Sequence, residues 1–237
     1  MTKKILYCRC SYANKIPKET EQEIFKILHL SDAEIFIVSD LCKLCAQKDS
    51  FLSSISQENF FILACHPRAI RSLFYQAGCT LQDSTLVLNL CKERPENILQ
   101  KINLTSGTPS FQEMQDTGEW IPWFPTIDYQ RCHNCKQCMN FCLFGVYEIN
   151  QQGKVEVVKP QNCKNNCPAC ARICPDIAII FPKYNQEPLD GAEILDEEKE
   201  RARAKENIET MLGDDPYQAL LQRRRKKAKI SLLKEQK

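Results

Sequence analysis

Glycine is scarce in this chain, with only seven among 237 residues. The seven are widely separated, so none of them can form a G-x-G-x-x-G turn or a Walker loop. Such loops let the backbone approach phosphate groups closely, and their absence argues against a bound NAD, FAD or ATP. The chain is therefore not expected to carry out hydride chemistry of its own.

Long apolar runs are missing as well. The longest stretches, Ile35–Val38 and Phe60–Cys65, are far shorter than the roughly 20 apolar residues that cross a bilayer. Met1 to Lys4 lead directly into a short apolar run and Cys8, without the hydrophobic region of a secretory signal. We therefore predict a cytoplasmic protein with no membrane span, whose contact with a membrane would need a partner.

The chain also lacks an excess of charge of one sign, because its formal net charge is +2. A nucleic-acid partner is therefore not expected. Charge is uneven only near the end, where the acidic stretch Asp196–Glu200 precedes the basic run Arg223–Lys227. We interpret this segment as a solvated helical tail. Docking to an acidic partner protein is the first alternative, and binding of RNA or anionic lipid is the second.

Cysteine, by contrast, is abundant, and the two halves of the chain use it differently. Of 15 cysteines, eight crowd between Cys132 and Cys174, and seven are spread from Cys8 to Cys91. This difference predicts two domains. In the reducing cytosol, clustered cysteines are more often metal ligands or redox-active thiols than structural disulfides.

The eight crowded cysteines form a duplicated motif. The spacing is Cys-x2-Cys-x2-Cys-x3-Cys in the first run and Cys-x3-Cys-x2-Cys-x3-Cys-Pro in the second. Tight spacing wraps a loop around one face of a [4Fe–4S] cubane, and the fourth cysteine of each run, at the start of the next helix, ligates the other cluster. The predicted ligands are Cys132, Cys135, Cys138 and Cys174 for one cluster, and Cys142, Cys163, Cys167 and Cys170 for the second.

Short apolar segments follow each run and are expected to become strands. Val146–Ile149 and Ala178–Phe181 should pair with each other and cover the clusters, so that water is restricted. Zinc is the alternative metal, because C-x2-C pairs also build tetrahedral sites. Two interlocked runs of four cysteines, each ending in C-x3-C, favour iron–sulfur clusters over zinc.

The segments Asp128–Cys142 and Cys170–Pro175 resemble the bacterial two-cluster ferredoxin family. Three features depart from the family pattern. Leu143 follows the first run where proline is usual, three residues separate Cys163 from Cys167, and the segment between the runs is long. None of these removes a ligand, but the two clusters are not expected to have equal potentials.

The first hundred residues alternate short apolar runs with helical patterns, which predicts a parallel α/β sheet. One helix is expected after Pro17 and another from Pro67 to Gly78. The predicted strands are Ile5–Tyr7, Glu34–Val38, Phe60–Ala64 and Thr85–Leu90.

Six cysteines lie at the carboxyl ends of these strands, namely Cys8, Cys10, Cys42, Cys45, Cys65 and Cys91. In an open parallel sheet such ends meet at one edge, so these thiols should converge. Cys65 also precedes a helix N-terminus, which favours thiolate character. An additional iron–sulfur cluster, a redox-active dithiol and simple buried cysteines all remain open. His66 is interpreted as a structural histidine rather than a ligand, and Cys79 as a buried thiol on the opposite edge.

Three short segments, Cys8–Cys10, Ser39–Cys42 and Ala64–Arg68, resemble the amino-terminal domain of the flavin-binding polypeptide of heterodisulfide reductase. The resemblance implies that these cysteines bind a third [4Fe–4S] cluster. The flavin-binding portion of that family is missing, in keeping with the absent glycine motif.

These observations predict an α/β domain with a small parallel sheet, followed by an α+β ferredoxin-like domain with two clusters and a helical extension. The expected boundaries are 1–104 for the first domain, 105–126 for a connector without helix or strand, 127–184 for the cluster domain and 185–237 for the charged tail.

The predicted function is electron transfer by an iron–sulfur protein, or one component of a complex, that relays low-potential electrons between partner oxidoreductases. No side chain is assigned a catalytic role. The alternative is a redox-responsive regulatory or assembly module that uses its clusters and amino-terminal thiols as a sensor. An enzyme in its own right would need a substrate bound at the sheet edge, and the sequence names none.

Overall fold

The computed structural model describes residues 2–114, 118, 120–223 and 225. The chain divides into two compact units, Met1–Pro122 and Trp123–Lys237. Each unit is described by itself below. No helix in the described ranges is long and apolar enough to cross a membrane.

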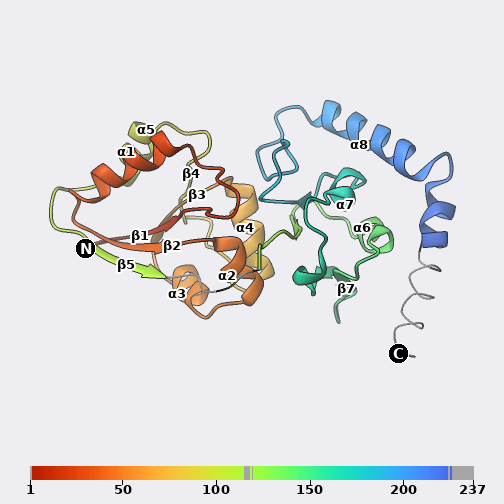
Figure 1. Ribbon diagram of the computed structural model, residues 1–237, viewed down its shortest axis with the longest axis horizontal. Helices are drawn as coiled ribbons and strands as arrows, with labels where there is room; N and C mark the ends of the chain where they lie inside the picture. The colour runs from red at the N-terminus through yellow and green to blue at the C-terminus, as the bar shows by residue number, and fades with distance from the viewer. Residues whose placement is uncertain (1, 115–117, 119, 224, 226–237) are drawn as a thin grey trace. The chain divides into compact units, whose positions relative to one another are not determined.

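The first unit is built on a parallel sheet of five strands in the order β4-β3-β1-β2-β5 (Figure 1). The central strand β1 is buried along Ile5–Cys8, as expected for a strand covered on both faces. The strands are β1 Lys3–Cys8, β2 Ala33–Val38, β3 Phe60–Ala64, β4 Val87–Asn89 and β5 Ser110–Met114.

Helices cover both faces of this sheet, with α1 and α5 on one face and α2, α3 and α4 on the other (Figure 1). Asp40 begins α2 by accepting a hydrogen bond from the Lys43 backbone amide at 3.2 Å. Pro67 occupies the first turn of α4, where its missing N–H costs nothing. The helices are α1 Lys18–Leu28, α2 Leu41–Gln47, α3 Phe51–Gln57, α4 Pro67–Gln76 and α5 Pro95–Ile102.

The α/β class and the four predicted strands are confirmed, but the structure corrects the prediction that 105–126 holds neither helix nor strand. Strand β5 lies in that segment and extends the sheet beside β2, in register from Glu34 with Ser110 to Val38 with Met114. Four of its five residues are exposed, so it lacks the apolar alternation that marks a half-buried strand. The first unit accordingly extends to Pro122.

The second unit contains two short antiparallel ribbons, formed by β6 with β9 and by β7 with β8. The prediction that Val146–Ile149 pairs with Ala178–Phe181 is therefore wrong. The segment between the runs supplies a nearby partner strand through a turn at Gly153, whose φ is +77°, and a local partner costs less loop-closure entropy. The strands are β6 Thr126–Ile127, β7 Tyr147–Ile149, β8 Val155–Val157 and β9 Ile179–Ile180.

Two short helices carry the third cysteine of each run and end before the fourth. Cys138 lies in α6 Gln137–Phe141 and Cys170 in α7 Ala169–Arg172. Cys142 and Cys174 follow these helices. This differs from the prediction that the fourth cysteine starts a helix.

The C-terminal segment is helical, as predicted, but it is not merely solvated. Helix α8 Glu197–Leu212 and helical residues 216–223 bring Leu212 and Leu220 into a buried cluster with Phe141 and Ile173. Of the basic run Arg223–Lys227, for which docking to an acidic partner was the first alternative, the structure describes residues 223 and 225, and the others lie outside the described residues.

Candidate metal centres

The first cysteine run begins in a loop, residues 132–136, that is bent by two residues with left-handed backbone. Asn134 and Lys136 both have φ of +64°. Asn134 tolerates this conformation and also fixes the loop, because its Nδ2 donates to the Gly153 carbonyl at 2.7 Å and its Oδ1 accepts from the Val155 amide at 3.0 Å. The β7–β8 ribbon thus holds the loop in shape.

The second run is arranged in the same way. Cys163 ends the 3₁₀ turn η1 Pro160–Asn162, and Asn166 supplies another left-handed residue, with φ of +59°. Helix α7 then presents Cys170, and Cys174 accepts a hydrogen bond from the Ala178 amide at 3.3 Å. Each run therefore wraps a short loop and one helical turn around a small volume.

The thiols of the first predicted set influence one another. Burial raises the pKa of Cys138, and the nearby Cys174, Cys135 and Cys132 raise it further. Burial also raises the pKa of Cys132, with a contribution from Cys135. Cys174 belongs to the second run, so the chain brings the end of that run to the first three cysteines.

The thiols of the second set line one cavity of about 260 Å³, formed in part by Cys142, Cys163, Cys167 and Cys170. Burial, followed by the nearby Cys142 and Cys167, raises the pKa of Cys163 to about 12. The other residues around this cavity are mostly apolar, with Val146 fully buried.

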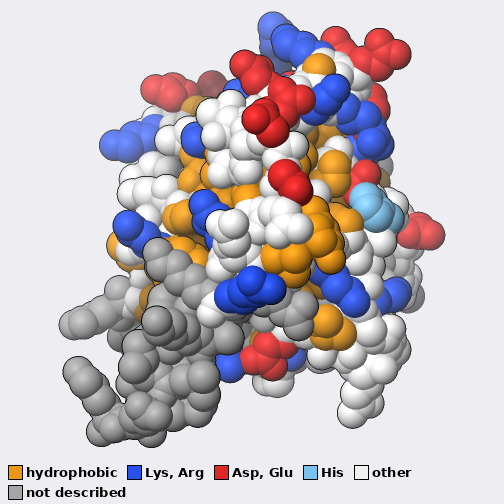
Figure 2. Space-filling model, turned by 90° about the vertical axis from the view of Figure 1, so that its right-hand side faces the viewer, with side chains coloured by type: hydrophobic (Ala, Val, Ile, Leu, Met, Phe, Trp, Pro, Cys, Tyr) orange, Lys and Arg blue, Asp and Glu red, His pale blue; other side chains and the backbone are white. Residues whose placement is uncertain are grey.

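At the surface, the neighbouring Leu143 and Phe144 are each 42% exposed. Figure 2 shows hydrophobic side chains gathered on one face of the molecule, with lysine and arginine side chains beside them.

These thiols fit iron–sulfur clusters in their chemistry. Buried thiols with raised pKa values stay protonated unless a cation neutralises the thiolate. Within the described ranges, no three His, Cys, Asp or Glu side chains are placed to hold one metal ion.

Tyr147 is a residue of this site that the sequence analysis missed. Its buried hydroxyl donates to Cys170 Sγ at 3.1 Å. Burial raises the pKa of Cys170, and this hydrogen bond lowers it in part. The residue begins β7, directly inside the cavity that holds the second set. Only the register of β7 reveals this role, because a tyrosine in a short strand is otherwise typical of a core position.

Replacing Tyr147 by phenylalanine is expected to lower the reduction potential of a cluster held by Cys170. A hydrogen bond to a thiolate favours the more negative, reduced cluster. A net loss of about 1 kcal/mol is about fivefold in the reduced-to-oxidised ratio at a fixed potential. Potentiometric titration measures the shift. Tyr129→Phe is the matched control, since that hydroxyl donates to the Val155 carbonyl at 2.7 Å; an equal shift in both variants would contradict the role of Tyr147.

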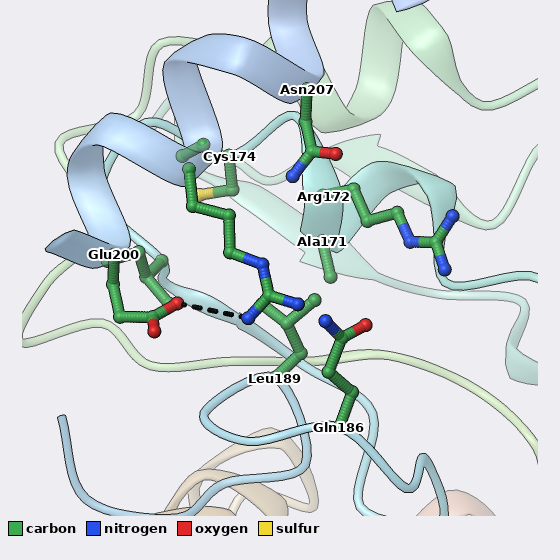
Figure 3. Close-up of a pocket in the computed structure, with 10 residues that line it drawn as sticks. Ala171, Arg172, Cys174, Gln186, Leu189, Glu200 and Asn207 are labelled. Carbon is green, nitrogen blue, oxygen red and sulfur yellow. Dashed lines mark ion pairs between the residues drawn. The ribbon is translucent and has the colours of Figure 1, made fainter.

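Cys174 also lines a second cavity, of about 240 Å³, between α7 and α8 (Figure 3). Glu200 of α8 forms an ion pair with Arg203 at 3.6 Å there, and Asn207 of the same helix lies beside them. The C-terminal extension thus stands next to the last cysteine of the second run.

The carboxyl edge of the parallel sheet in the first unit brings together five of the six predicted thiols. Burial raises the pKa of Cys65, and Cys10, Cys42 and Cys91 raise it further. Burial likewise raises the pKa of Cys8, and the nearby Cys10 raises it further. Burial therefore opposes the thiolate character expected for Cys65 as long as its thiol stands alone.

The sixth thiol lies apart. The side chains that raise the pKa of Cys45, after burial, are Asp40 and Cys79. Cys79 itself is only half-buried, contrary to prediction, and its Sγ lies 3.6 Å from Ser53 Oγ. His66 is buried and pairs through Nδ1 with the Asn89 amide at 3.2 Å, as a structural histidine would.

Comparison with known proteins identifies the character of the second unit. The family described as 4Fe-4S dicluster domain matches residues 124–175. An uncharacterized ferredoxin of Methanocaldococcus jannaschii is 51% identical over 63 residues, which are 26% of this chain and 42% of the relative. This chain therefore spans less than half of that protein.

Two further relatives match over most of their own length. Ferredoxin-3 of Nostoc sp. is 33% identical over 90 residues, covering 30% of this chain and 87% of the relative. The pyruvate synthase subunit PorD of Methanothermobacter marburgensis is 28% identical over 81 residues, covering 34% of this chain and 93% of the relative. No solved structure matches the chain significantly.

Proposed function

The chain belongs to the ferredoxin family, and from that premise we propose that it relays low-potential electrons between partner oxidoreductases through two [4Fe–4S] clusters. One observation carries the proposal: four cysteines from two separate runs line a single, mostly apolar cavity. A cluster bound there supplies one-electron transfer, and the chain's own residues hold it and exclude water.

We assign the ligands in crossed sets. Cys132, Cys135, Cys138 and Cys174 would hold the first cluster, and Cys142, Cys163, Cys167 and Cys170 the second. The effects of neighbouring thiols on the pKa values of Cys138 and Cys163 support this assignment. Cys138 also raises the pKa of Cys170, so the two sets lie close together. Tyr147 orients the Cys170 thiolate, and the Ala178 amide does the same for Cys174.

A third [4Fe–4S] cluster belongs to the same proposal. Cys65 and the three thiols that act on it, Cys10, Cys42 and Cys91, would supply four ligands from four separate points of the chain at one sheet edge. The resemblance of this unit to the flavin-binding polypeptide of heterodisulfide reductase supports such a cluster. The similarity to a component of pyruvate synthase supports partners of the oxidoreductase class.

Reductive titration of the anaerobically purified full chain tests the function. The signals of both clusters are expected to appear reversibly, each with one electron, and the reduced protein should pass its electrons to a viologen dye. Clusters that stay oxidised in the presence of a low-potential reductant would contradict electron transfer. A redox-responsive regulatory module stays the alternative prediction, and slow, incomplete transfer to the dye would favour it.

A further inference from the structure

The C-terminal extension is anchored beside both candidate centres of the second unit. At the start of α8, Glu197 bonds Arg131, the residue before Cys132, and also Arg201 at 2.9 Å. The bond from Arg131 lowers the pKa of Glu197, so the carboxylate stays charged. Asp176 contributes a further ion pair with Arg201 at 3.6 Å.

The other end of the extension is held by apolar packing. Leu212 and Leu220 are buried against Phe141 and Ile173, which directly precede Cys142 and Cys174. Ion pairs at one end and apolar contacts at the other fix the path of the helical residues 216–223 over the second unit.

This path places one cation at the second centre. The Arg223 guanidinium lies over the Phe141 ring, with Cζ 4.1 Å from the ring centre. Arg223 also lines the cavity formed by the four cysteines of the second set. The other lining residues are Pro125, Phe141, Leu143, Phe144, Val146, Tyr147 and Ala169, so Arg223 is the charged side chain among the residues that line this cavity.

We propose that Arg223 sets the reduction potential of the second cluster, an inference that rests on the proposed electron-transfer function. A cubane held by four thiolates is anionic and gains one more negative charge on reduction. A fixed cation in an apolar cavity interacts more strongly with that charge than a cation in water would. Arg223 therefore stabilises the reduced form and raises the potential of the second cluster relative to the same site without it.

The proposal also assigns a functional role to the helical extension. The resembling ferredoxin segments end at Pro175, whereas Arg223 reaches the second centre from 48 residues further along the chain (223 minus 175). The first centre receives ion-paired side chains of α8 instead. The extension would thus raise the potential of the second cluster relative to that of the first.

Three variants of the full chain test the proposal. Arg223→Met keeps an extended apolar side chain over Phe141 but removes the positive charge. Arg223→Gln replaces the charge by a neutral polar group, and Arg223→Lys keeps the positive charge. Potentiometric titration followed by electron paramagnetic resonance measures both clusters in each variant. The two uncharged variants are expected to lower the reduced-to-oxidised ratio of the second cluster at a fixed potential about tenfold, a shift of about 59 mV. In the lysine variant, the reduced-to-oxidised ratio of the second cluster at the same potential should stay within about threefold of the parent's.

The first cluster is the internal control, and its potential should not move. An unchanged second cluster in Arg223→Met and Arg223→Gln would overturn the inference and leave the proposed function intact. An equal shift of both clusters would also overturn it, because that result indicates a general change of structure. Failure of the parent chain to reduce would instead overturn the proposed function, and the inference with it.

Discussion

Replacing Cys142 by alanine is expected to remove the second cluster and to leave the first, although Cys142 lies in the first run. Its thiol raises the pKa of Cys163 and lines the cavity with the second set. Each lost cluster removes about four irons per chain. Iron and acid-labile sulfide analysis measures the loss.

Paired substitutions make this test sharp. If ligation is crossed, Cys142→Ala with Cys163→Ala costs no more iron than either change alone, because both remove the same cluster. Cys138→Ala with Cys142→Ala should instead remove about eight irons, although these two cysteines are only four residues apart. Uncrossed ligation would give the opposite pattern. The Cys142 and Cys163 pair would then remove about eight irons, and the Cys138 and Cys142 pair only about four.

Replacing Cys65 by alanine is expected to remove about four further irons from the first unit and to leave both ferredoxin-type clusters in place. Cys65 is buried among Cys10, Cys42 and Cys91 at the carboxyl edge of the sheet. A cluster that has lost one of its four thiolate ligands is expected to dissociate from the site. The parent chain should therefore contain about twelve irons in total, and the variant about eight.

Cys79→Ala is the matched control for this prediction. Cys79 lies in the same unit, but beside Ser53 and Cys45. Its loss should leave the iron content unchanged. A parent chain with about eight irons, unaltered by Cys65→Ala, would show that the first unit holds no cluster and would favour redox-active or simply buried thiols.

Much of this architecture follows from the sequence because strong local patterns dictate it. The strand Phe60–Ala64 and the helix beginning at Pro67 were predictable from an apolar run and a proline at a helix start. Convergence of Cys10, Cys42 and Cys65 followed from parallel topology alone, since carboxyl ends share one edge. Cys45 does not follow this rule because it lies three residues further along α2 than Cys42, and so further from the carboxyl end of β2.

Features that depend on contacts distant in sequence were not predictable. Strand β5 is exposed and joins the sheet only because β2 has a free edge. The hydrogen bond from Tyr147 depends on the exact register of a three-residue strand. The packing of Leu220 against Phe141 joins residues far apart in sequence, and the low apolar content of the tail gave no sign of it.

Iron, acid-labile sulfide and zinc measured on the anaerobically purified chain test the central claim most directly. Two ferredoxin-type clusters require at least about eight irons and about eight sulfides per chain, with no stoichiometric zinc. Zinc bound to the cysteines without iron or sulfide would contradict the account.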